Sequence, residues 1–433
     1  MKPGAELTVT VEKAVAGGRM LARHDGQVVL VAGTIPGERI RARITEVARG
    51  VAYAAPVEIL DPHPARRAAL HADTWHRGPC GGNLYQHIAY DHQLTLKQAV
   101  VVDAFSRIAR LDLASLGETP PIVASPEHGY RMRARLHLHR GRIGFFREGS
   151  HELCEASSTK QLSDAAIAVI GRVQDVLRPA EAVPLEGEVE FTENSQASER
   201  VLHLGLNRKL TLRELKAMTG VEGLTGFTTS IVGVHGAGVV IADPHVHEDI
   251  EIDAVPPVRL RRHVRSFFQS NRYLLNRLVA DLLARVPVGP VIDLYAGVGL
   301  FSVPLALAGR RPMVAVEVDA FSAHDLRTNA MGLDLFEIVE DSVEDFFAKL
   351  KLGATDVLTV VLDPPRTGVS KAALTSLIAL RPGRIVYVSC DVATLARDTR
   401  ALIGAGYQLK ELLGFDLFPN TAHIETIATV TID

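Results

Sequence analysis

From residue 259 onward the chain alternates short apolar runs with segments of helical spacing. The first of these segments, HVRSFFQSNRYLLNRLVADLLARV, is predicted as a helix with aromatic residues near its start. Five strand-and-helix units follow, and the β segment HIETIATVTI comes after them. Because alternating β and α units favour a doubly wound parallel sheet, we expect residues 256–433 to form an α/β domain.

Two strands of this domain, predicted at residues 357–363 and 384–390, end in the polar residues Asp363 and Cys390. Ligands of an open α/β sheet bind at the carboxyl ends of its strands, so both side chains are expected in one crevice. A helix begins directly after Cys390, and its N-terminus favours a thiolate by about 0.3–1 kcal/mol. Half ionisation at neutral pH needs about 2 kcal/mol, and Asp391 opposes the shift. A substrate or a nearby cation must complete the activation, unless Cys390 is simply a small buried core residue.

The turn after the first strand, DLYAGVGLFS, is rich in glycine. Gly297 and Gly299 allow the backbone to approach a ligand closely, and Glu317 ends the second strand at the position that holds ribose hydroxyls. Nicotinamide and flavin proteins share this arrangement. Here Ser302 stands at the third glycine position, and the fourth strand ends in Asp363-Pro-Pro-Arg, which hydride transfer does not need. We therefore predict S-adenosylmethionine binding and methyl transfer in preference to a dehydrogenase.

Composition limits the class of protein. The chain has 433 residues, of which 47% are hydrophobic, and no apolar run is long enough to span a bilayer. We expect a soluble protein of two to four domains without a membrane partner. Its first residues lack a basic segment followed by an apolar one, which predicts no secretion signal. Three cysteines form no disulfide framework, and this agrees with a reducing, cytoplasmic location.

The first 60 residues are predicted to form a small OB-like β-barrel. Short apolar or alternating runs at residues 7–11, 19–24, 27–32 and 38–46 are separated by GG, DG and PG turns. Basic residues decorate these runs, as in a nucleic-acid platform; they are Lys13, Arg19, Arg23, Arg39, Arg41 and Arg43. The alternative is a solvated face on a structural cap. Residues 61–67, with two prolines, are the expected linker.

Residues 61–255 are expected to form a central α+β domain that binds RNA. Residues 91–111 predict a helix that packs on the catalytic domain. Residues 129–147 contain six arginines and no acid, and Arg131, Arg133 and Arg135 alternate with apolar residues. Such spacing places the three guanidinium groups on one face of a strand, where they suit phosphate contacts. A merely solvated strand face is the alternative.

Six motifs together resemble one family, the bacterial RNA 5-methyluridine methyltransferases, which act on 23S rRNA or on the tRNA T-loop. The motifs are FFQSN (267–271), DLYAGVGLFS, VEVD, LDPPRTG (362–368), YVSCD (387–391) and FPNTAHIE (418–425). The first 60 residues resemble the TRAM domain that many members carry. The resemblance covers nearly the whole chain and is weakest from 150 to 255. It implies a Rossmann-like methyltransferase domain behind an N-terminal TRAM barrel and the central α+β domain.

The resemblance also implies roles for individual residues. Cys390 matches the nucleophile that adds to carbon 6 of uracil, after which carbon 5 attacks the sulfonium methyl. Glu425 matches the base that removes the proton from carbon 5. Asp363 stands where members bind the target base or the edge of the cofactor. The positions that match contacts to S-adenosylmethionine are Gln269, Tyr295, Gly297, Gly299, Glu317, Asp341 and Asp363.

Some rRNA-directed relatives hold a 4Fe-4S cluster with four cysteines. This chain has three cysteines, one of them needed for catalysis, so we predict no iron-sulfur cluster and no other metal. The substrate is expected to be rRNA rather than tRNA, and the protein is expected to be a monomer. Three other classes stay open, namely a nucleic-acid amino-group methyltransferase, a nicotinamide oxidoreductase and a non-catalytic RNA-binding protein.

Overall fold

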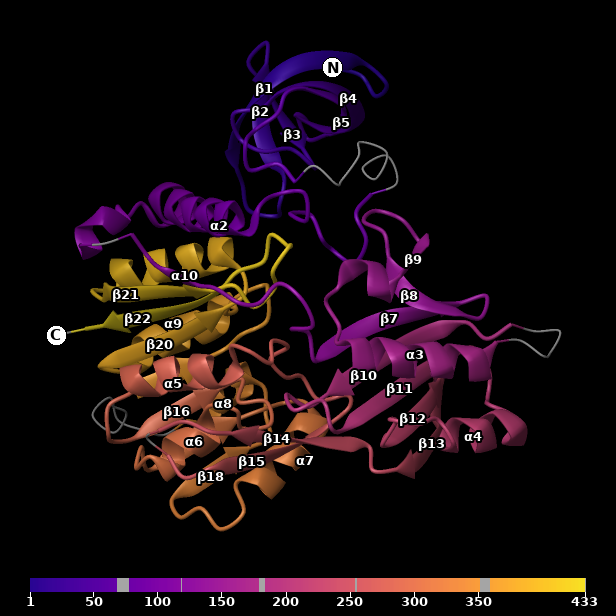
Figure 1. Ribbon diagram of the computed structural model, residues 1–433. Coiled ribbons are helices and arrows are strands. Elements are labelled where there is room, and N and C mark those ends of the chain that lie inside the picture. The colour runs from indigo at the N-terminus through magenta and orange to yellow at the C-terminus, as the bar shows by residue number, and fades with distance from the viewer. Residues whose placement is uncertain (68–77, 118, 179–183, 254, 351–358, 433) are drawn as a thin grey trace.

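The computed structural model describes residues 1–67, 78–117, 119–178, 184–253, 255–350 and 359–432. Within these ranges the strands form a closed barrel, a seven-stranded sheet, an eight-stranded sheet and a two-stranded hairpin. Figure 1 shows the barrel above the two larger sheets, which lie side by side. The fold class predicted from the sequence is confirmed. None of the helices described is long and apolar enough to cross a membrane.

The N-terminal barrel has the strand order β1-β2-β3-β5-β4. Its strands alternate buried and exposed residues, so each presents every second side chain to the barrel interior. The sequence predicts four strands and misses β5, which contains a proline and no clear alternation. Asp61, the first residue of the predicted linker, ends this strand. The bounds are Glu6–Ala14 (β1), Met20–His24 (β2), Gln27–Val31 (β3), Arg39–Ala48 (β4) and Val51–Asp61 (β5).

The central sheet has the order β13-β12-β11-β10-β7-β8-β9. Two helices, α3 and α4, cover one of its faces, where Val173 and Met218 share a core with Leu136 and Phe191. The other face carries polar side chains. The bounds are Arg133–His139 (β7), Arg142–Phe146 (β8), Leu153–Glu155 (β9), Gly187–Glu193 (β10), Arg200–Leu206 (β11), Gly226–Ile231 (β12), Val234–Ala242 (β13), Asp164–Leu177 (α3) and Leu212–Thr219 (α4). The hairpin β14 (His245–Ile250) and β15 (Val258–His263) leads to the C-terminal sheet.

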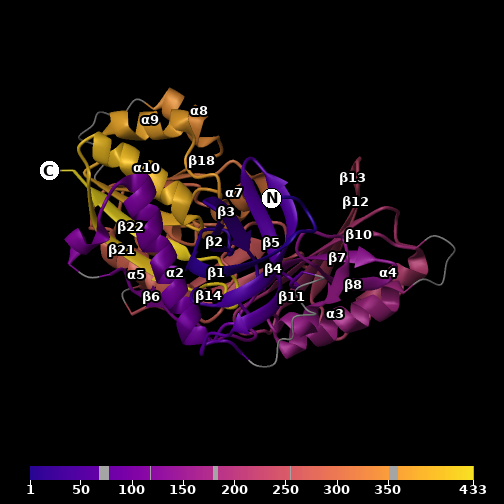
Figure 2. The same cartoon turned by 90° about the horizontal axis from the view of Figure 1, so that it is seen from above.

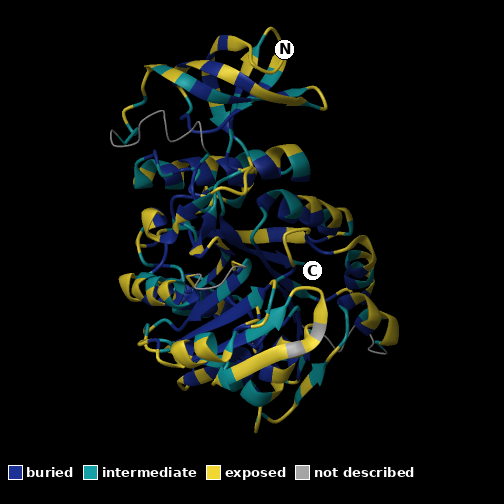
Figure 3. Ribbon diagram, turned by 90° about the vertical axis from the view of Figure 1, so that its right-hand side faces the viewer, coloured by how far each residue is buried: buried dark blue, intermediate teal, exposed yellow. Residues whose placement is uncertain are grey.

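The C-terminal sheet has the order β18-β17-β16-β19-β20-β22-β21-β6, and its four central strands, β16, β19, β20 and β22, are almost wholly buried (Figure 3). β16 pairs in parallel with β17 on one side and with β19 on the other. The crevice at the carboxyl ends of β16 and β19 is therefore the switch point at which such sheets bind ligands. The strands are Ile122–Val123 (β6), Val291–Leu294 (β16), Met313–Val316 (β17), Phe336–Val339 (β18), Thr359–Leu362 (β19), Arg384–Ser389 (β20), Gln408–Phe415 (β21) and Glu425–Thr431 (β22).

Helices cover both faces of this sheet, as expected for alternating units. They are Leu275–Arg285 (α5), Ser302–Leu307 (α6), Ala320–Asn329 (α7), Val343–Lys349 (α8), Lys371–Leu380 (α9) and Val392–Gly404 (α10). The predicted strand 357–363 begins at Thr359 within the described residues, and residues 357 and 358 lie outside them. Cys390 directly follows β20.

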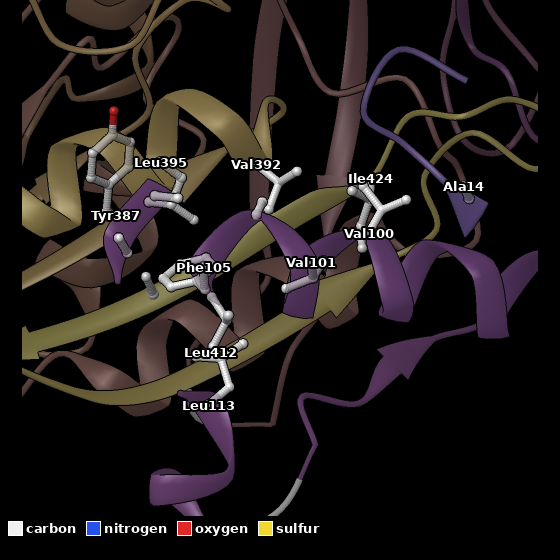
Figure 4. Packing of buried hydrophobic residues seen from close by; sticks show 14 of the residues in the cluster. Ala14, Val100, Val101, Phe105, Leu113, Tyr387, Val392, Leu395, Leu412 and Ile424 are labelled. Atoms are coloured by element: carbon white, nitrogen blue, oxygen red, sulfur yellow. The ribbon is translucent and has the colours of Figure 1, made fainter. Parts of the chain in front are cut away.

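The helix expected at 91–111 is α2, Tyr90–Ala104, which continues as a π-helical turn to Ala109. It crosses the C-terminal sheet on the side of the barrel (Figures 1 and 2). Val101 and the turn residue Phe105 pack with Leu395 of α10 and with residues of β21 in one buried cluster (Figure 4). A segment from the central part of the chain is thus built into the C-terminal domain.

Cys80 and Cys154 form a disulfide with their Cα atoms 6.0 Å apart. The sequence was expected to give no disulfide framework, and this single disulfide was not predicted. The two cysteines meet because segments far apart in the sequence both lie beside β8. Cys80 makes an isolated bridge with Arg147, which follows β8, and Cys154 of β9 pairs with Phe145 of β8. Cys390 is the free cysteine.

Candidate active site

The turn after β16 brings its backbone into an open space. Tyr295, Gly297 and Gly299 have positive φ angles of 65°, 57° and 93°. A Cβ atom at Gly299 would lie 2.8 Å from side-chain atoms of Leu326 and Val303, whereas one at Gly297 would meet nothing within 4 Å. Packing therefore requires glycine at 299, and the backbone at 297 is free to approach a ligand. The positive φ of a tyrosine stores strain of the kind found at functional sites.

Four of the predicted cofactor-binding residues border one cavity, which is lined by Gln269, Tyr295, Gly297 and Asp363 among others. Gln269 donates a hydrogen bond from Nε2 to Asp363 Oδ2 at 3.2 Å. The Glu317 carboxylate accepts a hydrogen bond from the backbone N of Gly297 at 2.8 Å. The switch point thus holds an amide, two carboxyl groups and exposed backbone within reach of one ligand.

Asp341 is placed differently. It follows β18 and pairs with Lys349 Nζ at 2.5 Å. The cavity that it lines is shared with Phe346 and Val339 rather than with Gln269. The structure therefore does not bring Asp341 together with the other predicted cofactor residues.

Asp293 is the most deeply buried acid of the crevice, with an exposed fraction of 1% in the middle of the sheet. Burial raises the pKa of Asp293 to about 8, with the carboxylates of Asp363 and Glu317 acting in the same direction and Ser302 opposing them. Burial likewise raises the pKa of Asp363 to about 7. At neutral pH the ligand-free crevice therefore retains protons that the unfolded chain would release.

This difference predicts a pH-dependent stability. An unfolded aspartate ionises near pH 4, so between about pH 4 and pH 8 unfolding releases the proton of Asp293. The stabilisation is complete below about pH 4 and is lost as pH rises through 8, at up to about 1.4 kcal/mol per pH unit. Asp293→Asn cannot ionise, so the free energy of urea unfolding should depend less steeply on pH between 5.5 and 7.5. Asp334→Asn, at an exposed position, is the matched control. A slope in Asp293→Asn equal to that of the wild type contradicts the assignment.

Cys390 and Glu425 come together through strand pairing. Ser389 is the Cα partner of Thr426 in the antiparallel pair of β20 and β22. The next residues outward along these strands are Cys390 and Glu425, so they follow the last paired positions opposite one another. Facing residues of an antiparallel pair project to the same side. Cys390 is partly exposed, whereas Glu425 is 3% exposed and its Oε1 has no hydrogen-bond partner.

Burial raises the pKa of the Cys390 thiol to about 12, and the carboxylates of Glu425 and Asp363 act in the same direction. In this ligand-free site the pKa of the thiol is therefore raised, and the small contribution expected from the helix N-terminus does not by itself produce a thiolate. Asp391 is the N-cap of α10 and its side chain accepts a hydrogen bond from Thr394 N at 2.9 Å. A backbone N–H group at the N-terminus of α10 thus bonds to the Asp391 side chain rather than to the thiol. Burial also raises the pKa of Glu425 well above its usual value, with Asp363 adding to the shift.

Arg366 supplies positive charge here. It lowers the pKa of both Cys390 and Glu425, and its Nη2 lies 3.3 Å from His423 Nε2. Burial, followed by Arg366, lowers the pKa of His423 to about 4, so this imidazole is neutral at physiological pH. Arg366 belongs to the same LDPPRTG motif as Asp363, but no role was predicted for it from the sequence. It is a described cation whose charge acts on Cys390 in the direction of the thiolate.

The three arginines of the predicted row do not share one environment. Arg131 precedes β7, donates to Gln161 Oε1 at 2.5 Å, and lies over the rings of Phe145 and Phe418. Arg133 and Arg135 are in β7, where they pair with glutamates of the adjacent strand β10. The structure therefore brings Arg131 to the loop that leads to Glu425, and it neutralises the other two.

Ion pairs also neutralise much of the basic face of the barrel. Arg41 and Arg43 share Glu6, and Arg41 also pairs with Glu58. These ion pairs are exposed, so solvent screens them and they contribute little to stability. Among the described residues no group of three or more His, Cys, Asp or Glu is arranged to hold a metal ion.

Comparison with known proteins places this site in a family. The family described as tRNA (uracil-5-)-methyltransferase matches residues 89–431, and the TRAM domain matches residues 1–57. The chain belongs to the tRNA (uracil-5-)-methyltransferase family. This confirms the resemblance found in the sequence motifs and assigns the N-terminal barrel as a TRAM domain.

Relatives match over nearly the full length of this uracil-5-methyltransferase. The 23S rRNA (uracil(1939)-C(5))-methyltransferase RlmD of Pectobacterium atrosepticum is 29% identical over 446 residues, covering 98% of this chain and 94% of the relative. RlmD of Alkalilimnicola ehrlichii is 33% identical, covering 95% and 93%. The crystal structure of Pyrococcus abyssi tRNA (uracil-54, C5)-methyltransferase with S-adenosyl-L-homocysteine has the same fold, with a TM-score of 0.75 at 23% identity, covering 98% of this chain and 100% of that one.

The protein is therefore an S-adenosylmethionine-dependent RNA uracil-5-methyltransferase. The crevice fits this cofactor. Gly297 leaves room that a Cβ atom would fill, and Glu317 stands at the end of the second strand where a ribose is held. Gln269 and Asp363 border the same cavity.

Proposed function

We propose that this enzyme methylates carbon 5 of a uridine in 23S rRNA through a covalent Cys390–uracil adduct, with Glu425 as the base. The observation that carries the proposal is the strand register that sets Cys390 and Glu425 opposite one another beside the crevice. Gln269, Tyr295, Gly297, Gly299, Glu317 and Asp363 are the proposed cofactor contacts. Asp341 remains a proposed contact on the strength of its motif position alone.

Uracil carbon 5 is a poor nucleophile, and this defines the task of Cys390. Its thiolate forms a bond to carbon 6, and the electron pair of the 5,6 double bond then makes carbon 5 nucleophilic. S-adenosylmethionine supplies the methyl group that carbon 5 accepts. Arg366 favours the thiolate, because its positive charge lowers the pKa of Cys390 against burial and two carboxylates. The proton of the thiol leaves to solvent before addition.

Glu425 completes the reaction. After methyl transfer carbon 5 carries both a methyl group and a hydrogen, and the Glu425 carboxylate removes this hydrogen as a proton. The electron pair of the broken C–H bond restores the 5,6 double bond, and the bond from carbon 6 to sulfur breaks to return the thiolate. Burial raises the pKa of Glu425, which makes it a stronger base than an exposed carboxylate once it is ionised.

A uridine that is stacked in folded RNA has an inaccessible carbon 6, so the target must be flipped out or lie in a loop. Arg131, over Phe418 beside the site, is the proposed first contact to this nucleotide. Arg133 and Arg135 are proposed phosphate contacts that exchange their glutamate partners for RNA. The proposed division into residues 1–60, 61–255 and 256–433 assigns the first two parts to RNA and the third to the chemistry.

The names of the full-length relatives favour 23S rRNA over tRNA as substrate. We infer a cytoplasmic enzyme that acts as a monomer. Mass-spectrometric mapping of 5-methyluridine in RNA from a deletion strain tests the substrate. The expected result is the loss of one or more 5-methyluridines from 23S rRNA with the tRNA T-loop unchanged. Loss from the T-loop alone would show the same chemistry on tRNA instead.

A further inference from the structure

The buried face of α2 carries two polar side chains, Gln93 and Lys97, in its first half. Gln93 and Lys97 are four residues apart, which places them one above the other on the helix. Their exposed fractions are 0% and 1%. A helix packed on a sheet normally buries apolar side chains, and a buried lysine costs free energy unless it is paired. We name these two side chains the polar pair of α2.

The polar pair binds the loop between β21 and β22, residues 416–424. Lys97 Nζ donates hydrogen bonds to Asp416 Oδ1 at 2.5 Å and to Phe418 O at 3.2 Å. Gln93 Nε2 donates to Asn420 Oδ1 at 2.9 Å, and the backbone N of Asn420 donates to Gln93 Oε1 at 2.9 Å. Every second residue in the first half of this loop is therefore held by α2.

The same loop forms one side of the active site. It joins Phe415 and Glu425, which are Cα partners at the end of the two strands. Within it, His423 lies 3.3 Å from the Arg366 guanidinium and the ring of Phe418 lies under Arg131. Its path therefore decides which groups surround the Glu425 carboxylate. Asn420 has a φ of 63°, so the backbone at this point is in a conformation that few residues adopt without support.

We propose that Gln93 and Lys97 are positioning residues, which hold loop 416–424 so that Glu425 stands at a fixed place opposite Cys390. This rests on the proposed function of Glu425 as the base. Neither residue touches the reacting atoms. Proton removal from carbon 5 depends on the geometry of the base, and a misplacement of about 1 Å can cost about 100-fold in rate. Thiolate addition and methyl transfer use groups on β16, β19 and β20, so a loosened loop slows the last step selectively.

Gln93→Leu tests the proposal, because leucine keeps the approximate size of the side chain and removes both bonds to Asn420, together with the bonds that Gln93 Nε2 donates to Tyr85 O and Ile88 O. The expected result is a fall in kcat of about 10- to 100-fold with an unchanged KM for S-adenosylmethionine. At the same time the fraction of enzyme in a denaturation-resistant protein–RNA adduct should rise above that of the wild type. Gln98→Leu is the matched control, because Gln98 lies on the same helix and, among the residues that the structure describes, donates to Pro120 O at 2.9 Å and not to loop 416–424.

Asn420→Gly is the second variant and protects the test against a folding failure of the first. Glycine suits the φ of 63° and removes the acceptor of the Gln93 amide. The adduct fraction should rise here too. The proposal is overturned if folded Gln93→Leu and Asn420→Gly turn over like the wild type, or if they lose activity without accumulating adduct. Glu425→Gln is assayed in parallel, so that failure of the positioning proposal can be told from failure of the proposed function. If Glu425→Gln traps no adduct, the proposed function itself is overturned.

Discussion

Cys390→Ala is expected to lower kcat for RNA methylation by at least about 10⁴-fold, because carbon 5 of uracil has no other route to activation once the nucleophile is removed. Binding of S-adenosylmethionine should be unchanged. Cys390 follows β20, whereas the cofactor cavity is lined by the turn after β16, the 267–269 segment and Asp363. Methyl-transfer assays and calorimetric titration with the cofactor measure the two effects separately.

Cys390→Ser distinguishes this mechanism from the rival class. A serine hydroxyl keeps the size of the side chain but is a far weaker nucleophile, so this variant should be nearly as inactive as Cys390→Ala. Activity close to that of the wild type would contradict covalent catalysis. It would favour an amino-group methyltransferase that uses Asp363 and its prolines and has no need of a thiol.

Glu425→Gln is expected to stop the reaction after methyl transfer. Glutamine has nearly the same shape as glutamate but cannot accept the proton from carbon 5, so the bond between Cys390 and carbon 6 cannot be released. We expect kcat to fall by about 10²–10⁴-fold and a stoichiometric adduct to build up. A protein band retarded by bound RNA on a denaturing gel measures it.

The control for this variant is Glu411→Gln. Glu411 is on β21, next to the strand that carries Glu425, but it faces solvent and pairs with Arg285. It should turn over as the wild type does and show no added adduct. Full activity in Glu425→Gln would show that another group removes the proton.

Much of the fold could be predicted because its signals are local. A buried strand can be predicted from its own apolar run, as at residues 359–362 and 384–389. The glycines after β16 likewise indicate a tight turn without reference to distant residues. The crevice at the switch point follows from the alternation of strands and helices. Cys390 and Asp363 could be named for the same reason, since each stands at the end of a strand, whereas Gln269 was named through the family resemblance.

The features that the sequence did not reveal depend on contacts between distant segments. Lys97 is paired with Asp416 and Cys80 with Cys154, and no local pattern reports either partner. The arginines at 133 and 135 looked available for RNA, because the glutamates of β10 that face them are more than 50 residues away in sequence. The effect of Glu425 on the pKa of Cys390 was hidden for the same reason, since Glu425 reaches the thiol only through the pairing of β20 with β22.

The covalent step is tested most directly by incubating Glu425→Gln with substrate RNA and S-adenosylmethionine, digesting the denatured complex, and mapping the cross-linked peptide by mass spectrometry. The expected product is a methylated uridine attached to the sulfur of Cys390. Recovery of the Cys390 peptide in unmodified form, with no uridine bound to it, would contradict the mechanism.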